Sequence, residues 1–238
     1  MFLIKKIISY FYFIFIKLIL FLYTAKILRP QKTTSKIISI GNITVGGTGK
    51  TPMIIYFSKL FSKWNINHGI ISRGYGRMSS GEVVVNDGKK TCVEVNKSGD
   101  ESQMLSLILK NIPIIVGNKI SACKLQEQKF NSEMILVDDG FQTFELDRFL
   151  DVVLIDLSSN LEDYCLLPSG KLREPLSSLK RADILIFTKQ NYSSLNAKII
   201  EKKILGFINK KNTLVTYANL ASAVLKYKNK SFLEVGAN

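Results

Sequence analysis

Residues 41–51 read Gly-Asn-Ile-Thr-Val-Gly-Gly-Thr-Gly-Lys-Thr, and this glycine-rich stretch constrains the fold more than any other part of the chain. It follows a β-branched run at 37–40 and precedes a segment of helical periodicity at 53–61. In such a setting, backbone N–H groups turn inward beside the partial positive charge of a helix N-terminus. Lys50 can then reach terminal phosphates, and the Thr51 hydroxyl can ligate Mg²⁺. The sequence therefore predicts a phosphate-binding P-loop.

The match to the strict pattern G-x-x-x-x-G-K-[ST] is incomplete, because Thr44 stands where that pattern has its first glycine. The alternative is a glycine-rich turn that merely ends in Lys-Thr.

After this loop, short apolar runs alternate with helical segments, which favours an α/β fold with a mostly parallel sheet and flanking helices, like that of P-loop NTPases. A hairpin is expected where the segments 82–85 and 92–95 flank Asn86-Asp87-Gly88. Further strands are expected at 69–72, 112–116, 134–137, 152–157 and 184–188, and helices at 100–110, 120–130 and 193–205.

A length of 238 residues allows one large domain, or one domain and part of another. The three cysteines are widely spaced and the chain has one histidine, which disfavours a zinc site and indicates reduced, structural cysteines in the cytosol. The lone His68 is expected to be structural.

The net charge of +14 is concentrated near the amino terminus, where twelve Lys or Arg precede the first acidic residue, Glu82. This asymmetry favours anionic partners. No nucleic-acid module is recognisable, so we expect no nucleic-acid partner.

Residues 7–23 are almost wholly apolar and aromatic, with basic residues on both sides. The stretch is about long enough to span a bilayer, but Lys17 lies inside it and would cost about 2.5–3.5 kcal/mol at the centre of a span. A helix lying in the leaflet fits as well, attracted by anionic lipids; a buried core helix is the alternative. No cleavage site indicates a removed signal peptide. We expect residues 1–28 to form a membrane-associated helix.

Two acidic clusters are candidates for chemistry. Asp138 and Asp139 end an apolar strand, where a carboxylate can hold Mg²⁺ or simply cap the next turn. Asp100 and Glu101 follow Gly99 at the start of a helix. They can act as a base for a hydroxyl nucleophile and as a carboxylate beside the metal, or serve as a helix cap. For Asp138 and Asp139 the presence of a P-loop in the chain favours the metal, whereas for Asp100 and Glu101 composition alone leaves both alternatives open.

Two basic loops complete the candidates. The loop 72–77 holds two arginines and two glycines, which can clamp a phosphate or form a solvated turn. The proline-bounded loop 167–175 contains Lys171, Arg173 and Glu174 and is a weak signal by itself.

In this order, the segments resemble the tetraacyldisaccharide 4'-kinase family of the lipid A pathway. The resemblance extends from the amino terminus to about residue 190. After the apolar amino-terminal helix, its motifs are Gly-Asn-Ile-Thr-Val-Gly-Gly-Thr-Gly-Lys-Thr-Pro (41–52), Ser-Arg-Gly-Tyr-Gly-Arg (72–77), Gly-Asp-Glu (99–101), Val-Asp-Asp-Gly-Phe-Gln (137–142), Leu-Pro-Ser-Gly-Lys-Leu-Arg-Glu-Pro (167–175) and Lys-Arg-Ala-Asp (180–183).

The resemblance implies phosphoryl transfer from ATP, with Mg²⁺, to the 4'-hydroxyl of a tetraacyldisaccharide 1-phosphate lipid A precursor. It places the enzyme at the cytoplasmic face of the bacterial inner membrane, with that anionic surface and the lipid as partners and no obligate protein partner. Asp100 would be the base, and Lys50, Gln142, Arg173 and Glu174 would line the reaction site. Metal ligands would be Thr51, Glu101, Asp138 and Asp139. The ATP phosphates would bind Thr44, Val45, Gly46, Gly47, Thr48, Gly49, Lys50 and Thr51.

The sequence departs from the family pattern in two ways. Thr143 stands where the family usually has His after Asp-Asp-Gly-Phe-Gln, and the family continues into a second lobe whose His-rich motif is not found here. We therefore expect a kinase domain at 29–205 and an incomplete second lobe at 206–238. The alternative is a catalytically impaired module that binds nucleotide and membrane. A P-loop GTPase is disfavoured, because Thr188-Lys189-Gln190-Asn191 lacks the aspartate of a base-reading motif.

Overall fold

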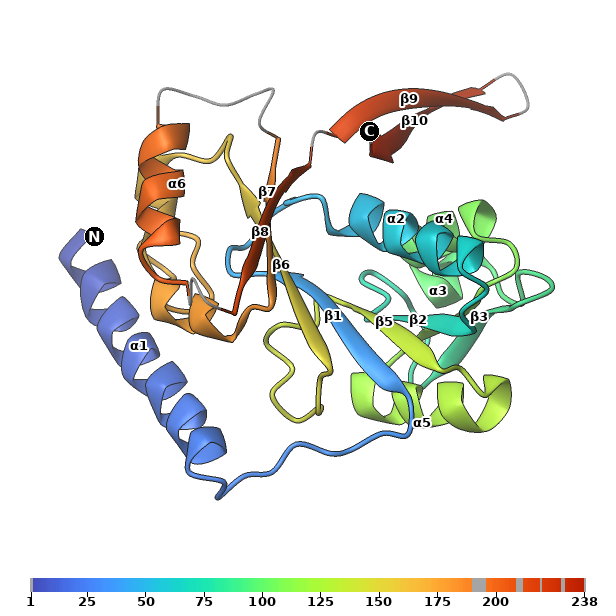
Figure 1. Ribbon diagram of the computed structural model, residues 1–238, viewed down its shortest axis with the longest axis horizontal. Coiled ribbons are helices and arrows are strands. Elements are labelled where there is room, and N and C mark those ends of the chain that lie inside the picture. Colours follow the sequence, from blue (N-terminus) through green and yellow to red (C-terminus); the bar gives the residue numbers. More distant parts are fainter. Residues whose placement is uncertain (1, 190–195, 209–211, 219, 228–229, 238) are drawn as a thin grey trace. The chain divides into compact units, whose positions relative to one another are not determined.

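The computed structural model describes residues 2–189, 196–208, 212–218, 220–227 and 230–237 (Figure 1). The chain divides into two compact units, each built from discontinuous segments. One comprises Met1–Arg29, Asn42–Pro52 and Val152–Asn238 and is called the P-loop unit below. The other comprises Pro30–Gly41 and Met53–Asp151 and is called the carboxylate unit.

The carboxylate unit contains five strands in the order β3-β4-β2-β5-β1. The neighbours β4, β2, β5 and β1 run parallel, and β3 is antiparallel to β4. The four parallel strands are almost wholly buried, as expected for a sheet covered on both faces. The bounds are β1 Lys36–Asn42, β2 His68–Ser72, β3 Val83–Asp87, β4 Pro113–Val116 and β5 Met134–Asp138.

Four helices accompany these strands: α2 Lys50–Lys63, α3 Val95–Ser98, α4 Asp100–Ile108 and α5 Lys119–Phe130. α5 packs on β2, β4 and β5, and its Ala122 and Cys123 are fully buried in one apolar cluster with isoleucines of the sheet. Asn118 caps the start of α5, because its side-chain oxygen accepts hydrogen bonds from the N–H groups of Ile120 and Ser121. The three cysteines are free thiols; Cys123 is buried, and Cys92 and Cys165 are exposed.

The predicted hairpin around Asn86-Asp87-Gly88 is confirmed only in part. The chain turns back there, with the Asp87 N–H donating to the Lys90 carbonyl (3.2 Å) and the Cys92 N–H to the Val85 carbonyl (2.8 Å), but residues 92–95 form no second strand. Asn86 and Asp87 belong to β3 itself, and the returning chain forms one isolated bridge, between Asn86 and Thr91. The Asp87 carboxylate accepts hydrogen bonds from the N–H groups of Lys89 and Lys90, which closes the turn one residue later than expected. The segment then leaves the sheet and enters α3. Within the carboxylate unit β3 is therefore an edge strand, and β4 is its neighbour.

The P-loop unit contains α1 Phe2–Thr24, three parallel strands and a separate antiparallel ribbon. The parallel strands are β6 Leu150–Asp156, β7 Ile184–Thr188 and β8 Leu214–Ala218, in that order. α6 spans Ala197–Leu205, two short 3₁₀ helices span Leu161–Tyr164 and Leu176–Arg181, and the ribbon is β9 Leu220–Tyr227 with β10 Lys230–Ala237. The first three residues of the helix expected at 193–205 lie outside the described residues.

Both units alternate helices with mostly parallel strands, which confirms the expected α/β fold class. The boundaries expected at residues 28 and 205 stay a prediction. β8 lies beyond the second of them and pairs in parallel with β7.

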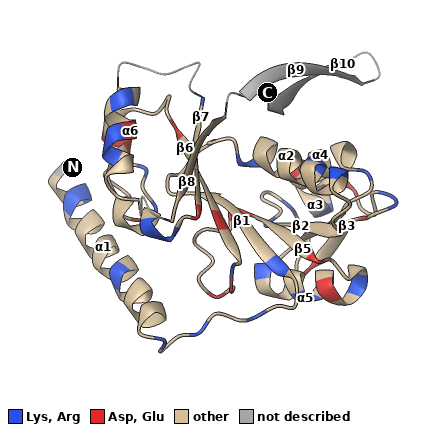
Figure 2. Cartoon of the chain, in the orientation of Figure 1, with Lys and Arg blue, Asp and Glu red and all other residues tan. Residues whose placement is uncertain are grey.

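α1 has one face that contacts the rest of the P-loop unit and another that is exposed and apolar. Ile16 is buried, and Ser9 and Tyr12 reach other parts of the P-loop unit through hydrogen bonds. The other face is exposed and carries Ile7, Phe11, Ile14, Phe15, Leu18 and Phe21. Figure 2 shows basic but no acidic residues along this helix. By length and composition alone, Leu3–Thr24 is apolar enough to cross a membrane, with a mean hydropathy of 2.0.

Candidate active site

The segment 43–49 connects β1 to α2, which is the strand–loop–helix setting expected of a P-loop. Gly46 and Gly49 have φ angles of +120° and +91°, which favour glycine. The tip at 45–47 is exposed. α2 begins at Lys50, so the partial positive charge of its N-terminus follows the loop directly. Loop and helix start together form an arrangement that can bind an anion.

The loop is paired with the segment that contains Arg173. The Val45 N–H donates to the Lys171 carbonyl (2.8 Å), and the Arg173 N–H donates to the Ile43 carbonyl (2.7 Å). These strand-like bonds fix the entry to the loop. They also show that the structure brings Arg173, predicted for the reaction site, beside the predicted phosphate-binding residues.

Glu174 is fully buried and forms an ion pair with Arg181. The two terminal nitrogens of Arg181 donate to the two carboxylate oxygens at 3.0 and 3.2 Å. The preceding carbonyl, that of Arg173, accepts a hydrogen bond from the Tyr12 hydroxyl (2.7 Å). Burial raises the Tyr12 pKa, and the charge of Glu174 raises it further, so this hydroxyl stays a donor. The segment 173–174 is therefore held by both α1 and the second 3₁₀ helix.

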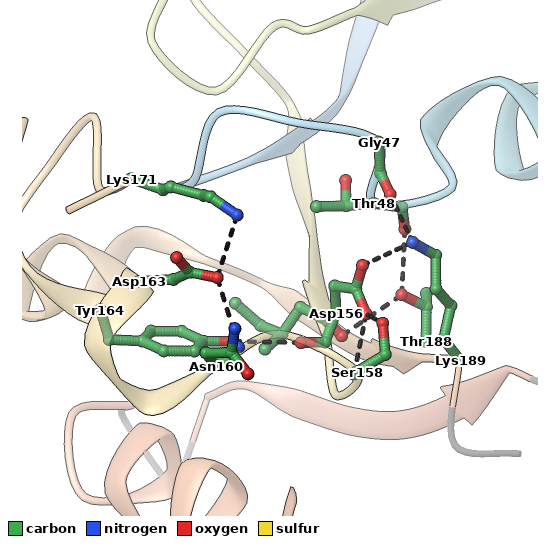
Figure 3. A network of polar contacts seen from close by, with 11 residues as sticks. Gly47, Thr48, Asp156, Ser158, Asn160, Asp163, Tyr164, Lys171, Thr188 and Lys189 are labelled. Carbon is green, nitrogen blue, oxygen red and sulfur yellow. Dashed lines mark hydrogen bonds and ion pairs between the residues drawn. The ribbon is translucent and has the colours of Figure 1, made fainter. Parts of the chain in front are cut away.

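Two side chains at the end of β7, those of Thr188 and Lys189, hold the P-loop through its carbonyl groups (Figure 3). The Thr188 hydroxyl donates to the Thr48 carbonyl at 2.9 Å, and Lys189 Nζ donates to the Gly47 carbonyl at 2.7 Å. Lys189 also forms a 2.6 Å ion pair with Asp156 at the end of β6. No sequence motif assigns a role in phosphate binding to these three residues.

In the carboxylate unit, Asp138 and Asp139 lie at the end of β5, as predicted. Asp138 is buried and accepts a hydrogen bond from the Ser72 hydroxyl (3.2 Å). Asp139 is half-buried with a φ of +52°, and its carbonyl accepts a hydrogen bond from Lys119. Lys119 also donates to the Thr143 hydroxyl (3.2 Å), at the position where the resemblance predicts His.

Gln142 follows in the same loop and is half-buried. Its neighbour Phe141 is fully buried against Gly41, where an added Cβ would lie 2.7 Å from the Phe141 Cβ. The first glycine of the 41–51 stretch is thus required for packing against this loop.

Asp100 and Glu101 are exposed at the first turn of α4. Their carboxylates form no hydrogen bond or ion pair with another residue in the part of the chain that the structure describes. Gly99 has φ +82° and ψ 154°, and a Cβ there would lie 2.5 Å from the Tyr75 carbonyl oxygen. Glycine at this position therefore lets the 72–77 loop pack directly against the start of α4.

The predicted site residues thus fall into two sets. Asp100, Glu101, Asp138, Asp139 and Gln142 belong to the carboxylate unit, and the P-loop residues, Arg173 and Glu174 belong to the P-loop unit. Among the described residues, no three His, Cys, Asp or Glu side chains are close enough to hold a metal ion by themselves. The predicted magnesium ligands, which include the Thr51 hydroxyl, are all oxygen donors of the kind that Mg²⁺ prefers.

The model of the Tetraacyldisaccharide-1-P 4'-kinase family matches residues 2–234 of this chain. The chain belongs to this family. The match includes every motif from which the resemblance was drawn, together with β6, β7 and α6.

Individual members of the tetraacyldisaccharide 4'-kinase family agree with this assignment. The chain is 39% identical over 217 residues to the enzyme of Halothermothrix orenii, covering 90% of this chain and 56% of that protein. It is 39% identical over 174 residues to the enzyme of Desulfotalea psychrophila, covering 72% of this chain and 50% of that protein. The chain therefore spans about half the length of the curated relatives it matches.

A solved member of the kinase family has the same fold. The crystal structure of the "apo" form of LpxK from Aquifex aeolicus in complex with ATP superposes with a TM-score of 0.75 at 29% identity. It covers 92% of this chain and 64% of that chain.

The contacts of Asp156, Thr188 and Lys189 with the P-loop could not be predicted from sequence, for a physical reason. Asp156 and Thr188 are the last residues of two buried strands, and ligands of open α/β sheets bind at such strand ends. That rule was a usable signal, but Lys189 lies 142 positions from Gly47. Only the fold shows that this lysine reaches the P-loop.

Proposed function

We propose that this chain binds Mg²⁺-ATP on residues 44–51 and transfers the γ-phosphoryl group to the 4'-hydroxyl of a tetraacyldisaccharide 1-phosphate lipid A precursor. The observation that carries the proposal is a glycine-rich loop between β1 and α2, with positive φ at Gly46 and Gly49, in a chain that belongs to the tetraacyldisaccharide 4'-kinase family. ATP in the crystal structure of the Aquifex aeolicus relative supports the choice of nucleotide.

The P-loop residues have the groups that phosphate binding needs. Backbone N–H groups of Gly46 to Gly49 and the start of α2 supply hydrogen-bond donors and partial positive charge. Lys50 supplies a full charge for the terminal phosphates. Arg173, held beside the loop, supplies a second cation for charge that develops during transfer.

Asp100 is the proposed base. The oxygen of the sugar hydroxyl attacks the γ-phosphorus, the bond from this phosphorus to the ADP oxygen breaks, and Asp100 accepts the hydroxyl proton. Its exposed carboxylate can receive a proton from a bound substrate, because no described residue occupies it. Gln142 and Glu174 are proposed to line the reaction site, Glu174 through its hold on Arg181.

Thr51, Glu101, Asp138 and Asp139 are the proposed holders of Mg²⁺. When bound, the ion neutralises charge on the nucleotide phosphates. Ser72 fixes the orientation of one of these carboxylates, that of Asp138.

α1 is proposed to rest in the cytoplasmic leaflet of the inner membrane, with the anionic surface as partner. One face packs on the P-loop unit while the other is exposed and apolar, which suits a helix lying between protein and lipid. Lys5 and Lys6 add attraction to anionic lipids. This location would place the protein where its lipid acceptor lies.

The direct test is phosphate transfer. The purified chain is incubated with Mg²⁺, γ-labelled ATP and vesicles that contain the tetraacyl disaccharide, and labelled lipid is measured. We expect labelled product from the wild type and none from Lys50→Ala. ATP binding and vesicle binding without labelled lipid would instead support the alternative, a nucleotide- and membrane-binding module that lacks catalysis.

The membrane proposal has its own test. Replacing Phe11 and Phe15, both exposed on α1, with Ser should weaken partitioning into anionic vesicles at least ~10-fold, because each buried aromatic contributes about 1.5–3 kcal/mol. Tyr56 and Trp64 are exposed elsewhere and serve as the matched control pair. Equal loss from the control pair would contradict the assignment of α1 to the membrane.

A further inference from the structure

In each peptide unit the N–H and C=O groups point in opposite directions. A loop that directs its N–H groups toward a phosphate therefore directs its carbonyl groups away from it. Those carbonyls need donors of their own when they are shielded from water. In this P-loop the carbonyls of Gly47 and Thr48 accept hydrogen bonds from two consecutive side chains, those of Lys189 and Thr188. Both donors lie at the end of β7.

These two side chains are themselves firmly held. Thr188 is fully buried, and its hydroxyl also lies 3.3 Å from the Ile155 carbonyl. Lys189 has a φ of +58°, a conformation that a non-glycine residue adopts only when its surroundings stabilise it. Its ion pair with Asp156 is one such stabilising contact.

Asp156 is in turn fixed by local hydrogen bonds. One carboxylate oxygen accepts from both the backbone N–H and the hydroxyl of Ser158, at 2.9 and 2.6 Å. The other accepts from Lys189. The backbone carbonyl of Asp156 accepts from the buried Tyr164 hydroxyl at 3.2 Å. A chain of contacts therefore runs from the end of β6 through Lys189 to the middle of the P-loop (Figure 3).

We propose that Thr188 and Lys189, with Asp156 behind them, are positioning residues that set the P-loop in its phosphate-binding conformation before the nucleotide arrives. The inference rests on the proposed function, because it assigns residues that prepare the same ATP site. Lys189 supplies a charge-assisted hydrogen bond, which is stronger than a neutral one. Thr188 supplies a bond in a fully buried position, where an unsatisfied carbonyl is costly.

The test compares variants by two readouts. Lys189→Met removes the donor and keeps the stem, Lys189→Arg restores a cation, and Asp156→Asn removes only the charge behind the lysine. Lys198→Met removes an exposed lysine from α6 of the same unit and is the matched control. Mg²⁺-ATP affinity is measured by calorimetry, and amide hydrogen exchange of residues 44–49 is measured without nucleotide. Thermal unfolding shows that each variant is folded.

We expect Lys189→Met to weaken ATP binding at least ~10-fold and to speed exchange of the loop amides, with a smaller effect from Asp156→Asn. Lys189→Arg should recover part of both, and Lys198→Met should change neither. In turnover assays the KM for ATP should rise more than kcat falls. Wild-type exchange and affinity in Lys189→Met, or an equal loss in Lys198→Met, would overturn the inference. A wild type that binds no ATP would overturn the proposed function instead, while loop exchange would still decide the role of Lys189.

Discussion

The P-loop and the start of α4 share one local conformation but carry side chains of opposite charge. In each, a glycine with positive φ, Gly49 at +91° and Gly99 at +82°, precedes the first residue of a helix. The first begins with the cation Lys50 and the second with the anions Asp100 and Glu101. The N-terminal helix dipole favours the acidic pair, whereas Lys50 lies against it. A bound phosphate would offset this unfavourable interaction, because its negative charge attracts both Lys50 and the helix N-terminus.

The two regions also differ in how they are held. The P-loop is fixed by donors from other segments, among them Arg173 and Lys189. The carboxylates of Asp100 and Glu101 are exposed and form no such contacts within the described residues. Ordering a flexible residue costs about 1–2 kcal/mol, so a loop held in advance binds its ligand with less loss. We infer that the P-loop is built for binding and the start of α4 for reaction.

The largest effect is expected at Asp100, where a substitution should change the reaction rate but not the free energy of unfolding. Asp100→Asn should lower kcat by about 10²–10⁴-fold, because it removes the proposed proton acceptor. Its exposed position should leave the free energy of unfolding within about 0.5 kcal/mol of wild type. Rates of lipid phosphorylation and urea unfolding check both parts. A destabilised protein would mean that Asp100 caps the helix instead.

The next effect concerns the ion pair beside the P-loop. Arg181→Met leaves the fully buried Glu174 without its bidentate partner and should lower the free energy of unfolding by about 3–5 kcal/mol. Lys171→Met breaks the exposed 3.0 Å pair with Asp163 and should cost less than about 1 kcal/mol. Chemical denaturation measures both. Equal losses would show that burial does not distinguish these pairs.

Gly99 offers a smaller but sharper test of the α4 start. Its φ and ψ lie in a region that is nearly restricted to glycine, so Gly99→Ala should cost about 3 kcal/mol. Gly76 has a similar φ of +75°, but no atom lies within 4 Å of its added Cβ. Gly76→Ala should therefore cost only about 1 kcal/mol. Thermal unfolding distinguishes the two, and similar costs would rule out the close approach of Tyr75 as the cause.

The smallest expected effect is a pH dependence from the only histidine, His68, which lies outside both regions. Its Nδ1–H donates to the Ile66 carbonyl and its Nε2 accepts from the Ser58 hydroxyl. Burial lowers its pKa, so the unfolded chain binds the proton more tightly. The contribution of neutral His68 to the free energy of unfolding should be fully present above about pH 6.5. It should decrease below that pH, by at most about 1.4 kcal/mol per pH unit. Unfolding of His68→Gln measured across pH 5–7 should lack this component; an unchanged slope would contradict it.

Sequence patterns predicted the elements whose cause is local. Glycine-rich loop chemistry located the P-loop, and buried apolar runs located β1, β2, β5 and β7. The turn after Asn86-Asp87-Gly88 was predicted, but the second strand of the hairpin is absent because the returning chain enters α3 at Val95. The partnership of Glu174 with Arg181 and the reach of Lys189 to Gly47 depend on tertiary packing, which periodicity does not encode.

The claim that joins fold to function is that ATP phosphates rest on residues 44–51. Amide hydrogen exchange of the intact chain, with and without Mg²⁺-ATP, tests it most directly. We predict that ATP slows exchange of the 44–51 amides and that Lys50→Ala abolishes this protection. Equal exchange of these amides in the presence and absence of ATP, at nucleotide concentrations that saturate the protein, would contradict the account.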